Sequence, residues 1–173
     1  MASPMNILLS PFMSQALDLA ASAAERGEVP VGALIVRDGR VIATATNAMC
    51  NGNDPTAHAE MLAIRNAAET LGNQRLDGRD LWVTLEPCAM CAGAISHARI
   101  ARLYYAASDP KGGAVEHGAR VFAQDTCHHR PEVYSGMGEA ESSTMLRAFF
   151  AERRLGADLS SGARFHFALF NHG

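Results

Sequence analysis

The sequence predicts a three-layer α/β/α fold with a mixed central sheet of about five strands. Segments with apolar residues at helical spacing alternate with short β-branched runs, in the order α-β-β-α-β-α-β. Two of the strands are each followed by a helix and a further strand, which favours parallel pairing with helices on both faces of the sheet. The chain has 173 residues, 48% of them hydrophobic, which suits one domain with a substantial core.

The first helix is predicted over residues 11–26. Ser10-Pro11 is typical of an N-cap followed by proline at the first helical position. Residues 31–37 and 40–46 are predicted strands, because Asp38-Gly39 between them is a strong hairpin turn. The apolar face of the helix is predicted to consist of Phe12, Ala16, Leu17, Ala20, Ala21 and Ala24.

The middle of the chain supplies two more helices and two more strands. Residues 47–56 are polar and rich in Gly and Asn, which indicates a loop. A helix is predicted from residue 56 or 57 to 71, a strand buried on both faces over 81–85, a helix over 89–97 and a strand over 100–106. The first of these helices is predicted to bury Met61, Ile64, Ala68 and Leu71, and the second to approach a neighbouring element through the small residues Ala92, Gly93 and Ala94.

The last third of the chain is predicted to be a long loop followed by a helix. Residues 107–138 are rich in Gly, Pro and His, with room for a fifth strand near Val133, and loops of this length are usually functional. A helix follows over about 138–154. We expect residues 1–155 to form a single domain and 156–173 a C-terminal tail, either packed as an extra strand or adventitious.

Composition and charge narrow the range of functions. The formal net charge is −3, and all but one of the 15 basic residues are arginine, which does not indicate general nucleic-acid binding. No apolar run approaches membrane length, and residues 1–10 lack a basic and a long apolar region, so we expect neither a membrane span nor a signal peptide. Four cysteines could form two disulfides, but two of them are better used as metal-binding thiolates, which favours a reducing cytoplasm. Cys50 and Cys127 are then free thiols.

Two short motifs carry the chemistry: His58-Ala59-Glu60 and Pro87-Cys88-Ala89-Met90-Cys91. Cys88 and Cys91 are three residues apart, so on a helix their sulfurs lie about 60° apart and share one face. Pro87 favours the start of that helix, where the helix dipole lowers the pKa of a thiol and promotes the metal-binding form. A C-x-x-C pair alone could equally be a redox dithiol.

His58 favours the metal over the redox interpretation. One imidazole and two thiolates give three protein ligands, which is the count of a catalytic zinc with a fourth position open for water. On a helix Glu60 points about 160° away from His58, so we expect it to act on the bound water rather than on the metal. A structural zinc, with Cys127 or His128 as fourth ligand, is the alternative.

The two motifs resemble the zinc-dependent nucleoside and nucleobase deaminases, in which a glutamate that is not a ligand serves as acid and base. Within that group the chain resembles the bacterial tRNA adenosine deaminases. The resemblance implies a cytidine deaminase-like fold, a homodimer, and one zinc per chain with a bound catalytic water. It implies deamination of the wobble adenosine (position 34) of a tRNA anticodon to inosine, with release of ammonia. It rests on the segments 28–33, 54–60, 81–94 and 109–114 and on Phe149, Phe150, Arg153 and Arg154.

The resemblance also implies roles for individual residues. Asn47 would hydrogen-bond the flipped base, Asp109 would approach the anticodon-loop sugar, and Phe150 and Arg153 would contact flanking nucleotides. Segment 115–131 is longer than its equivalent in the family, and segment 156–173 lies outside the family pattern; either could reshape the mouth of the site. Two alternatives therefore stay open: a deaminase of a free base such as guanine or cytosine, and a non-catalytic zinc-stabilised interaction domain. The implied set is His58, Cys88 and Cys91 for metal, Glu60 for catalysis, and Asn47, Val29, Ala59, Asp109, Phe150 and Arg153 for substrate.

Overall fold

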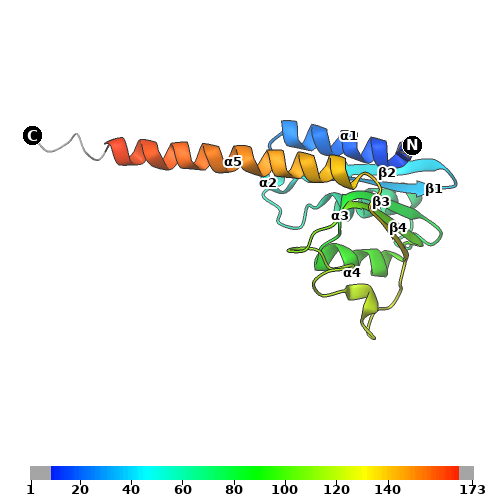
Figure 1. The fold of residues 1–173 in the computed structure, drawn as a ribbon. Helices are drawn as coiled ribbons and strands as arrows, with labels where there is room; N and C mark the ends of the chain where they lie inside the picture. Colours follow the sequence, from blue (N-terminus) through cyan, green and yellow to red (C-terminus); the bar gives the residue numbers. More distant parts are fainter. Residues whose placement is uncertain (1–8, 168–173) are drawn as a thin grey trace, which may run out of the picture.

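The architecture is a five-stranded sheet covered by helices on both faces (Figure 1). A computed structural model of the protein describes residues 9–167, with side chains described for 9–156. The elements are α1 (Pro11–Glu25), β1 (Gly32–Arg37), β2 (Arg40–Thr46), α2 (Met49–Gly52), α3 (Ala59–Leu71), β3 (Asp80–Leu85), α4 (Ala89–Ala98), β4 (Arg102–Ala107), η1 (Val121–Ala123), β5 (Glu132–Ser135) and α5 (Glu139–Phe167).

The sheet is mixed, as the sequence predicts. The strand order is β2-β1-β3-β4-β5, with β1 antiparallel to both of its neighbours and β3, β4 and β5 parallel to one another. Asp38 and Gly39 join β1 to β2 with φ angles of 49° and 74°. The two-residue hairpin turn whose twist matches that of its strands requires a positive φ at both of its residues. Asp-Gly adopts these angles with little strain.

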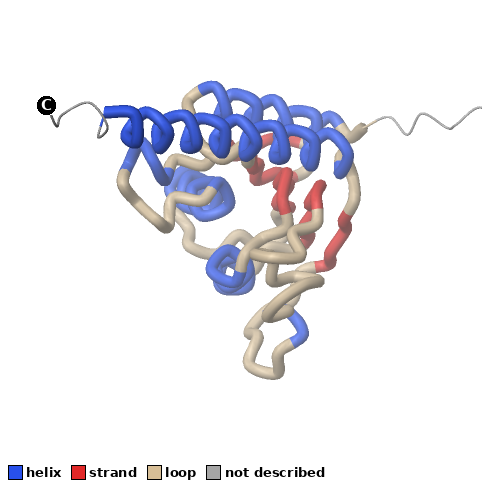
Figure 2. The backbone as a smooth tube through the Cα atoms, turned by 60° about the vertical axis from the view of Figure 1, so that its left-hand side comes forward, coloured by secondary structure: helices blue, strands red, loops and turns tan. Residues whose placement is uncertain are grey.

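Each face of the sheet has its own apolar core. In β3, Leu81 and Val83 face α3 and α4, whereas Trp82 between them packs on the side of α1. This alternation confirms the prediction of a strand buried on both faces. Figure 2 shows α1 and α5 side by side on one face of the sheet, with α3 and α4 on the other.

Gly32 sets the distance between α1 and β1. A Cβ atom at this position would lie 2.2 Å from the carbonyl oxygen of Ala16 and 2.8 Å from the Cβ of Leu19. The backbone of α1 therefore lies directly on the first residue of β1. Only glycine allows this approach without displacing the helix.

A row of aromatic rings crosses the α1 face of the sheet. Trp82 stacks on Tyr104 with ring centroids 3.9 Å apart and planes 4° apart, and Tyr104 stacks on Tyr134 at 4.9 Å. Phe12 of α1 packs against Trp82 with ring centroids 5.5 Å apart and planes tilted by 48°. Residues 82, 104 and 134 are direct partners in the register of β3, β4 and β5, so strand pairing itself aligns the rings.

The predicted buried stripe of α3 is only partly correct. Ala59, Ala63 and Ala67 are fully buried, whereas the four predicted residues are partly buried, and of these Ile64 and Leu71 pack against the same core. Alanines facing the sheet let the helix axis approach β1 and β2 closely, so the larger apolar residues spread to the flanks of the contact. Volume, rather than hydrophobicity alone, decides which stripe faces inward.

Other element predictions need smaller corrections. Residues 47–56 contain the short helix α2, and the fourth strand begins at Arg102 rather than at residue 100. A Cβ at Gly93 would meet nothing within 4 Å, so the predicted close approach there is wrong, although neighbouring Ala92 is buried.

The last helix is longer than predicted. α5 continues through Phe167, so the strand considered near 164–170 is wrong up to that residue; the remainder lies outside the described residues. Figure 1 shows the C-terminal half of α5 extending away from the sheet. Among the described residues, no helix is both long and apolar enough to cross a membrane.

Candidate active site

The two zinc motifs meet where two helices begin. His58 is the N-cap residue of α3 and Cys88 is the N-cap residue of α4, while Cys91 lies in the first turn of α4. His58 Nδ1 is 3.7 Å from the Sγ of Cys88 and 3.5 Å from the Sγ of Cys91. All three potential ligand atoms lie within 4.8 Å of one another.

These separations fit a tetrahedral zinc ion. Bond lengths of about 2.3 Å to sulfur and about 2.0 Å to nitrogen, at a tetrahedral angle, place a sulfur and a nitrogen about 3.5 Å apart. The observed S···N distances of 3.5 and 3.7 Å are close to this value. Three ligands of this chemistry leave one coordination position open, as in catalytic zinc sites.

Hydrogen bonds link the protonation states of the three ligand groups. Hydrogen bonding from Cys91 and His58 lowers the pKa of Cys88 to about 4, so Cys88 is a thiolate at neutral pH. The hydrogen bond of Cys91 to the Cys88 thiolate, together with burial, raises the pKa of Cys91. The hydrogen bond with Cys88 also raises the pKa of His58. A metal ion bound here displaces the protons that the three groups share.

Glu60 lies beside the cluster without belonging to it. It is in the first turn of α3, and only 4% of it is exposed. Burial raises the pKa of Glu60 to about 7, which places proton uptake and release near neutral pH. Glu60 lines the same cavity as His58 and Cys88, so a buried proton carrier adjoins the metal-binding group.

The cavity has a volume of about 290 Å³ and is formed by segments far apart in the sequence. It is lined by His58, Glu60 and Cys88 and by residues from the segment before β1, from α2, from the loop after β4 and from α5. The lining residues are Val29, Val31, Asn47, Met49, His58, Glu60, Leu85, Glu86, Cys88, Asp109, Gly112, Leu146 and Phe150.

Four of the six substrate residues implied by the resemblance, Val29, Asn47, Asp109 and Phe150, line this cavity. Ala59 is fully buried and faces the core. Arg153 lies outside the lining, with its guanidinium 4.6 Å from the ring centroid of Phe149 and hydrogen-bonded to the carbonyl of Gly27. The substrate roles of all six stay predictions.

Asn47 connects the cavity wall to the start of α3. Its side-chain oxygen accepts the N–H of Ala59 at 2.8 Å, and Asn47 is 5% exposed. His58 provides no side-chain cap to α3, so Asn47 caps the first N–H of the helix from outside it. The bond leaves the Asn47 amide nitrogen as the group that can donate to a bound base.

Several residues of the site were not predicted from the sequence. Met49 and Leu146 lie on α2 and α5, and only the fold brings them to the cavity. Glu86 carried a detectable signal, because an acid ends an apolar strand immediately before the zinc motif. Burial raises the pKa of Glu86, but backbone hydrogen bonds from Asp109 and His117 outweigh burial and leave it below its ordinary value.

The residues considered as a fourth zinc ligand lie elsewhere. Cys127 and His128 line a separate cavity of about 200 Å³ together with Gly93 and His97 of α4. Cys127 Sγ is 3.4 Å from the hydroxyl of Ser96. The four-ligand structural zinc site is therefore not formed by these residues.

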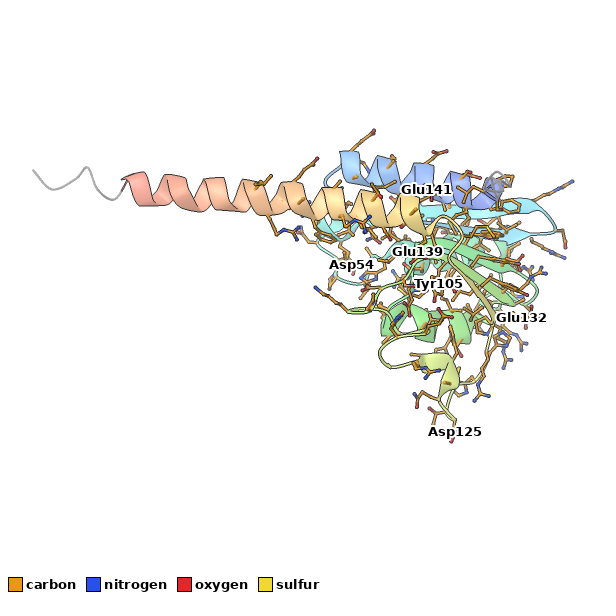
Figure 3. All side chains as sticks on the ribbon, in the orientation of Figure 1. Asp54, Tyr105, Asp125, Glu132, Glu139 and Glu141 are labelled. Carbon is orange, nitrogen blue, oxygen red and sulfur yellow. The ribbon has the colours of Figure 1, made fainter. Side chains whose placement is uncertain are left out.

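Segment 115–131 does not line the active-site cavity, although its first three residues hydrogen-bond Glu86, which does. Of the described residues that line the active-site cavity, none comes from this segment. Figure 3 shows Asp125 at its outer end, far from the sheet that carries Tyr105. The predicted reshaping of the cavity mouth by 115–131 is not seen.

Fold and site together define a class, the zinc-dependent deaminases of nucleosides and nucleobases. Residues 8–107 match the family model for the cytidine and deoxycytidylate deaminase zinc-binding region. The chain is 63% identical over 144 residues to the tRNA-specific adenosine deaminase of Agrobacterium fabrum, an alignment that covers 83% of this chain and 95% of that protein. The chain belongs to this family, in its bacterial tRNA-specific adenosine deaminase branch.

Solved structures place the fold in the same class. A structure from a study of A-to-I editing by tRNA:A34 deaminases superposes with a TM-score of 0.77 at 63% identity, covering 78% of this chain and 98% of that one. A guanine deaminase from Nitrosomonas europaea superposes with a TM-score of 0.66 at 26% identity, covering 84% and 87%. The predicted cytidine deaminase-like fold is confirmed, and the higher identity favours the tRNA branch over the free-base alternative.

Proposed function

We propose that the protein is a zinc-dependent hydrolytic deaminase that converts the wobble adenosine, position 34 of a tRNA anticodon, to inosine and releases ammonia. The observation that carries this proposal is the 63% identity to a tRNA-specific adenosine deaminase, which extends over 95% of the length of that protein. The site agrees with it, because the buried Glu60 lies in one cavity with His58 and Cys88.

The reaction needs a nucleophilic water and a group that moves its proton. His58, Cys88 and Cys91 would hold the zinc ion, which supplies Lewis acidity and lowers the pKa of a bound water toward neutrality. Glu60 takes a proton from the water that attacks C6 of adenine. Glu60 then delivers that proton to the exocyclic amine as the C6–N bond breaks, so ammonia leaves and the ring keeps the oxygen.

The walls of the cavity suit a flipped base. Val29 and Val31 line the cavity with apolar surface that would cover a ring face, and the Asn47 amide would donate a hydrogen bond to the edge of the base. An adenosine in an anticodon loop is unpaired, so extracting it costs only local unstacking.

A second depression supports a polynucleotide rather than a free base. It has a volume of about 250 Å³ and shares Leu85, Asp109, Leu146 and Phe150 with the active-site cavity. Phe150 is 43% exposed and offers a ring to a flanking base, and Arg147 on the same helix offers a cation to a phosphate. A free base would fill the first cavity and leave these groups unused.

We also propose that the protein acts in the cytoplasm as a homodimer. Thiolate zinc ligands favour a reducing compartment, where a tRNA substrate is also present. The dimer rests on the family resemblance.

The test is ammonia release and inosine formation by zinc-loaded protein. The substrates are an anticodon stem-loop with adenosine at the wobble position and a panel of free bases and nucleosides. We expect inosine in the stem-loop and no turnover of the panel. Glu60→Ala should keep one zinc per chain and lose at least about 10²–10⁴-fold in kcat, the usual contribution of a general acid–base group. Turnover of guanine or cytosine without turnover of the stem-loop would refute the proposal.

A further inference from the structure

The loop after β4 is built around the side chain of Glu86. The side chain of Glu86 is completely buried. One carboxylate oxygen, Oε1, accepts the backbone N–H groups of Val115, Glu116 and His117 at 3.1, 2.9 and 3.0 Å. Three consecutive amides therefore converge on one atom.

The second oxygen holds the other end of the same loop. Oε2 of Glu86 accepts the backbone N–H of Asp109 at 2.9 Å and contacts Nδ1 of the His117 ring at 2.7 Å. The two oxygens thus join residue 109 to residues 115–117. Hydrogen bonds to a charged acceptor are among the stronger ones in proteins, and a buried carboxylate with five such contacts is well compensated.

Packing leaves the loop no room to move around this carboxylate. A Cβ at Gly113 would lie 2.5 Å from Glu86 Cδ and 2.5 Å from the carbonyl oxygen of Asp109. Next to it, Ala114 donates its N–H to the carbonyl of Pro87 at 2.9 Å. The loop is therefore attached to both residues that precede Cys88.

Asp109 is the part of the loop that reaches the substrate region. It lines both the active-site cavity and the adjoining depression. Its Oδ1 accepts the N–H groups of Lys111 and Gly112, so its carboxylate orientation follows from the fold of the loop. Whatever fixes that fold also fixes Asp109.

We propose that Glu86 is a positioning residue for the substrate: it holds Asp109 and the loop 109–117 in a fixed place relative to the start of α4, where Cys88 lies. One buried carboxylate thus fixes the position of Asp109, which would contact the RNA, relative to Cys88, which would bind the metal. The inference rests on the proposed function, because Asp109, the residue that Glu86 positions, is the one proposed to contact the nucleotide.

The substitution Glu86→Gln should keep the hydrogen bonds at one end of the loop and break the one at the other end. With its amide oxygen in the place of Oε1, glutamine keeps the three bonds to 115–117. Its NH₂ group then faces the N–H of Asp109, donor against donor. We expect KM for the stem-loop to rise by about 10–100-fold, the usual effect of losing one charge-assisted hydrogen bond, with kcat and zinc content unchanged. Glu69→Gln, at an exposed position on α3, is the matched control.

Two further measurements distinguish positioning from a general structural role. Hydrogen exchange of zinc-loaded Glu86→Gln should accelerate in segment 109–117 and stay unchanged in α1 and β1. In a double-mutant cycle, Glu86→Gln should add no further rise in KM to Asp109→Ala, because the first residue acts through the second. Gly113→Ala, which displaces the loop from the carboxylate, should raise KM in the same way and serves if Glu86→Gln fails to fold.

The outcomes test the positioning role of Glu86 and the proposed deaminase function separately. If the wild type converts the stem-loop, unchanged KM and unchanged exchange in Glu86→Gln would overturn the positioning role and leave the deaminase function standing. Multiplicative effects with Asp109→Ala, or zinc loss with normal exchange in 109–117, would also overturn it. If the wild type is inactive on the stem-loop, the proposed function fails, and the exchange measurement still decides whether Glu86 holds the loop.

Discussion

Replacement of Asn47 by aspartate should remove base recognition and leave the fold intact. The Asn47 oxygen accepts the N–H of Ala59 at 2.8 Å, and aspartate can accept the same bond. A negative charge near the start of α3 is also favoured by the helix dipole. What aspartate cannot supply is the amide donor that faces the cavity.

The expected magnitudes follow from these two bonds. A buried polar partner left unpaired costs about 1–3 kcal/mol, so Asn47→Asp should lower kcat/KM for the stem-loop by about 10–100-fold without lowering Tm. Asn47→Ala removes the cap as well. Loss of a helix cap costs about 0.5–2 kcal/mol, which corresponds to a Tm lower by about 1–8 °C in a chain of this size.

The assay compares steady-state inosine formation and thermal unfolding of the zinc-loaded variants. Asn73→Asp is the matched control, because Asn73 also accepts a backbone N–H, that of Arg75, at 2.9 Å on the exposed surface. Wild-type kcat/KM in Asn47→Asp would refute base recognition by Asn47. An unchanged Tm in Asn47→Ala would refute its role as the cap of α3.

Three further predictions concern stability. Removing zinc should lower Tm reversibly, with a loss of about 4 kcal/mol if free zinc had been about a thousandfold above its Kd; an unchanged Tm would argue against zinc binding at the two helix starts. Glu28 is buried, and its hydrogen bonds from Asn51 and Cys50 outweigh burial and hold its pKa below the ordinary value of 4.5. The stabilisation by the Glu28 carboxylate is thus present above pH 4.5 and is lost as pH falls through the lower pKa of the folded state. Glu28→Gln should therefore cost about 1–3 kcal/mol of unfolding free energy at pH 7. In urea unfolding, the difference between this variant and the wild type should shrink in acid. Gly32→Ala, whose Cβ would meet the carbonyl of Ala16 at 2.2 Å, should cost at least about 1–3 kcal/mol, whereas Gly52→Ala, with open space around it, should not.

Local sequence patterns were sufficient for the parts of the fold that local physics controls. The Asp38-Gly39 hairpin and the doubly buried strand β3 follow from turn chemistry and residue type over a few positions. The metal-binding group could also be predicted, because His58 and the Cys88–Cys91 pair are constrained by ligand count and helix periodicity. The hairpin, the strand and each zinc motif are local in the sequence, whereas the pairing of His58 with the cysteines rests on ligand count across 30 residues of chain.

Tertiary packing decided what the sequence left open. Met49 and Leu146 reach the cavity only because α2 and α5 lie against it, and no short pattern announces that contact. In α3 the alanines face the sheet, because small volume mattered more there than hydrophobicity. Glu86 could be noticed as an acid beside the zinc motif, but its five contacts come from residues 23–31 positions further along the chain.

The aromatic row on the α1 face gives the protein a built-in optical probe. Trp82 is the single tryptophan of the chain, and it stacks nearly parallel to Tyr104 in the middle of the sheet. Its fluorescence and its near-ultraviolet circular dichroism will therefore report on pairing of β3 with β4. Since Trp82 faces α1, whereas the metal ligands lie at the starts of α3 and α4, the spectrum can separate melting of the sheet from local changes at the metal site.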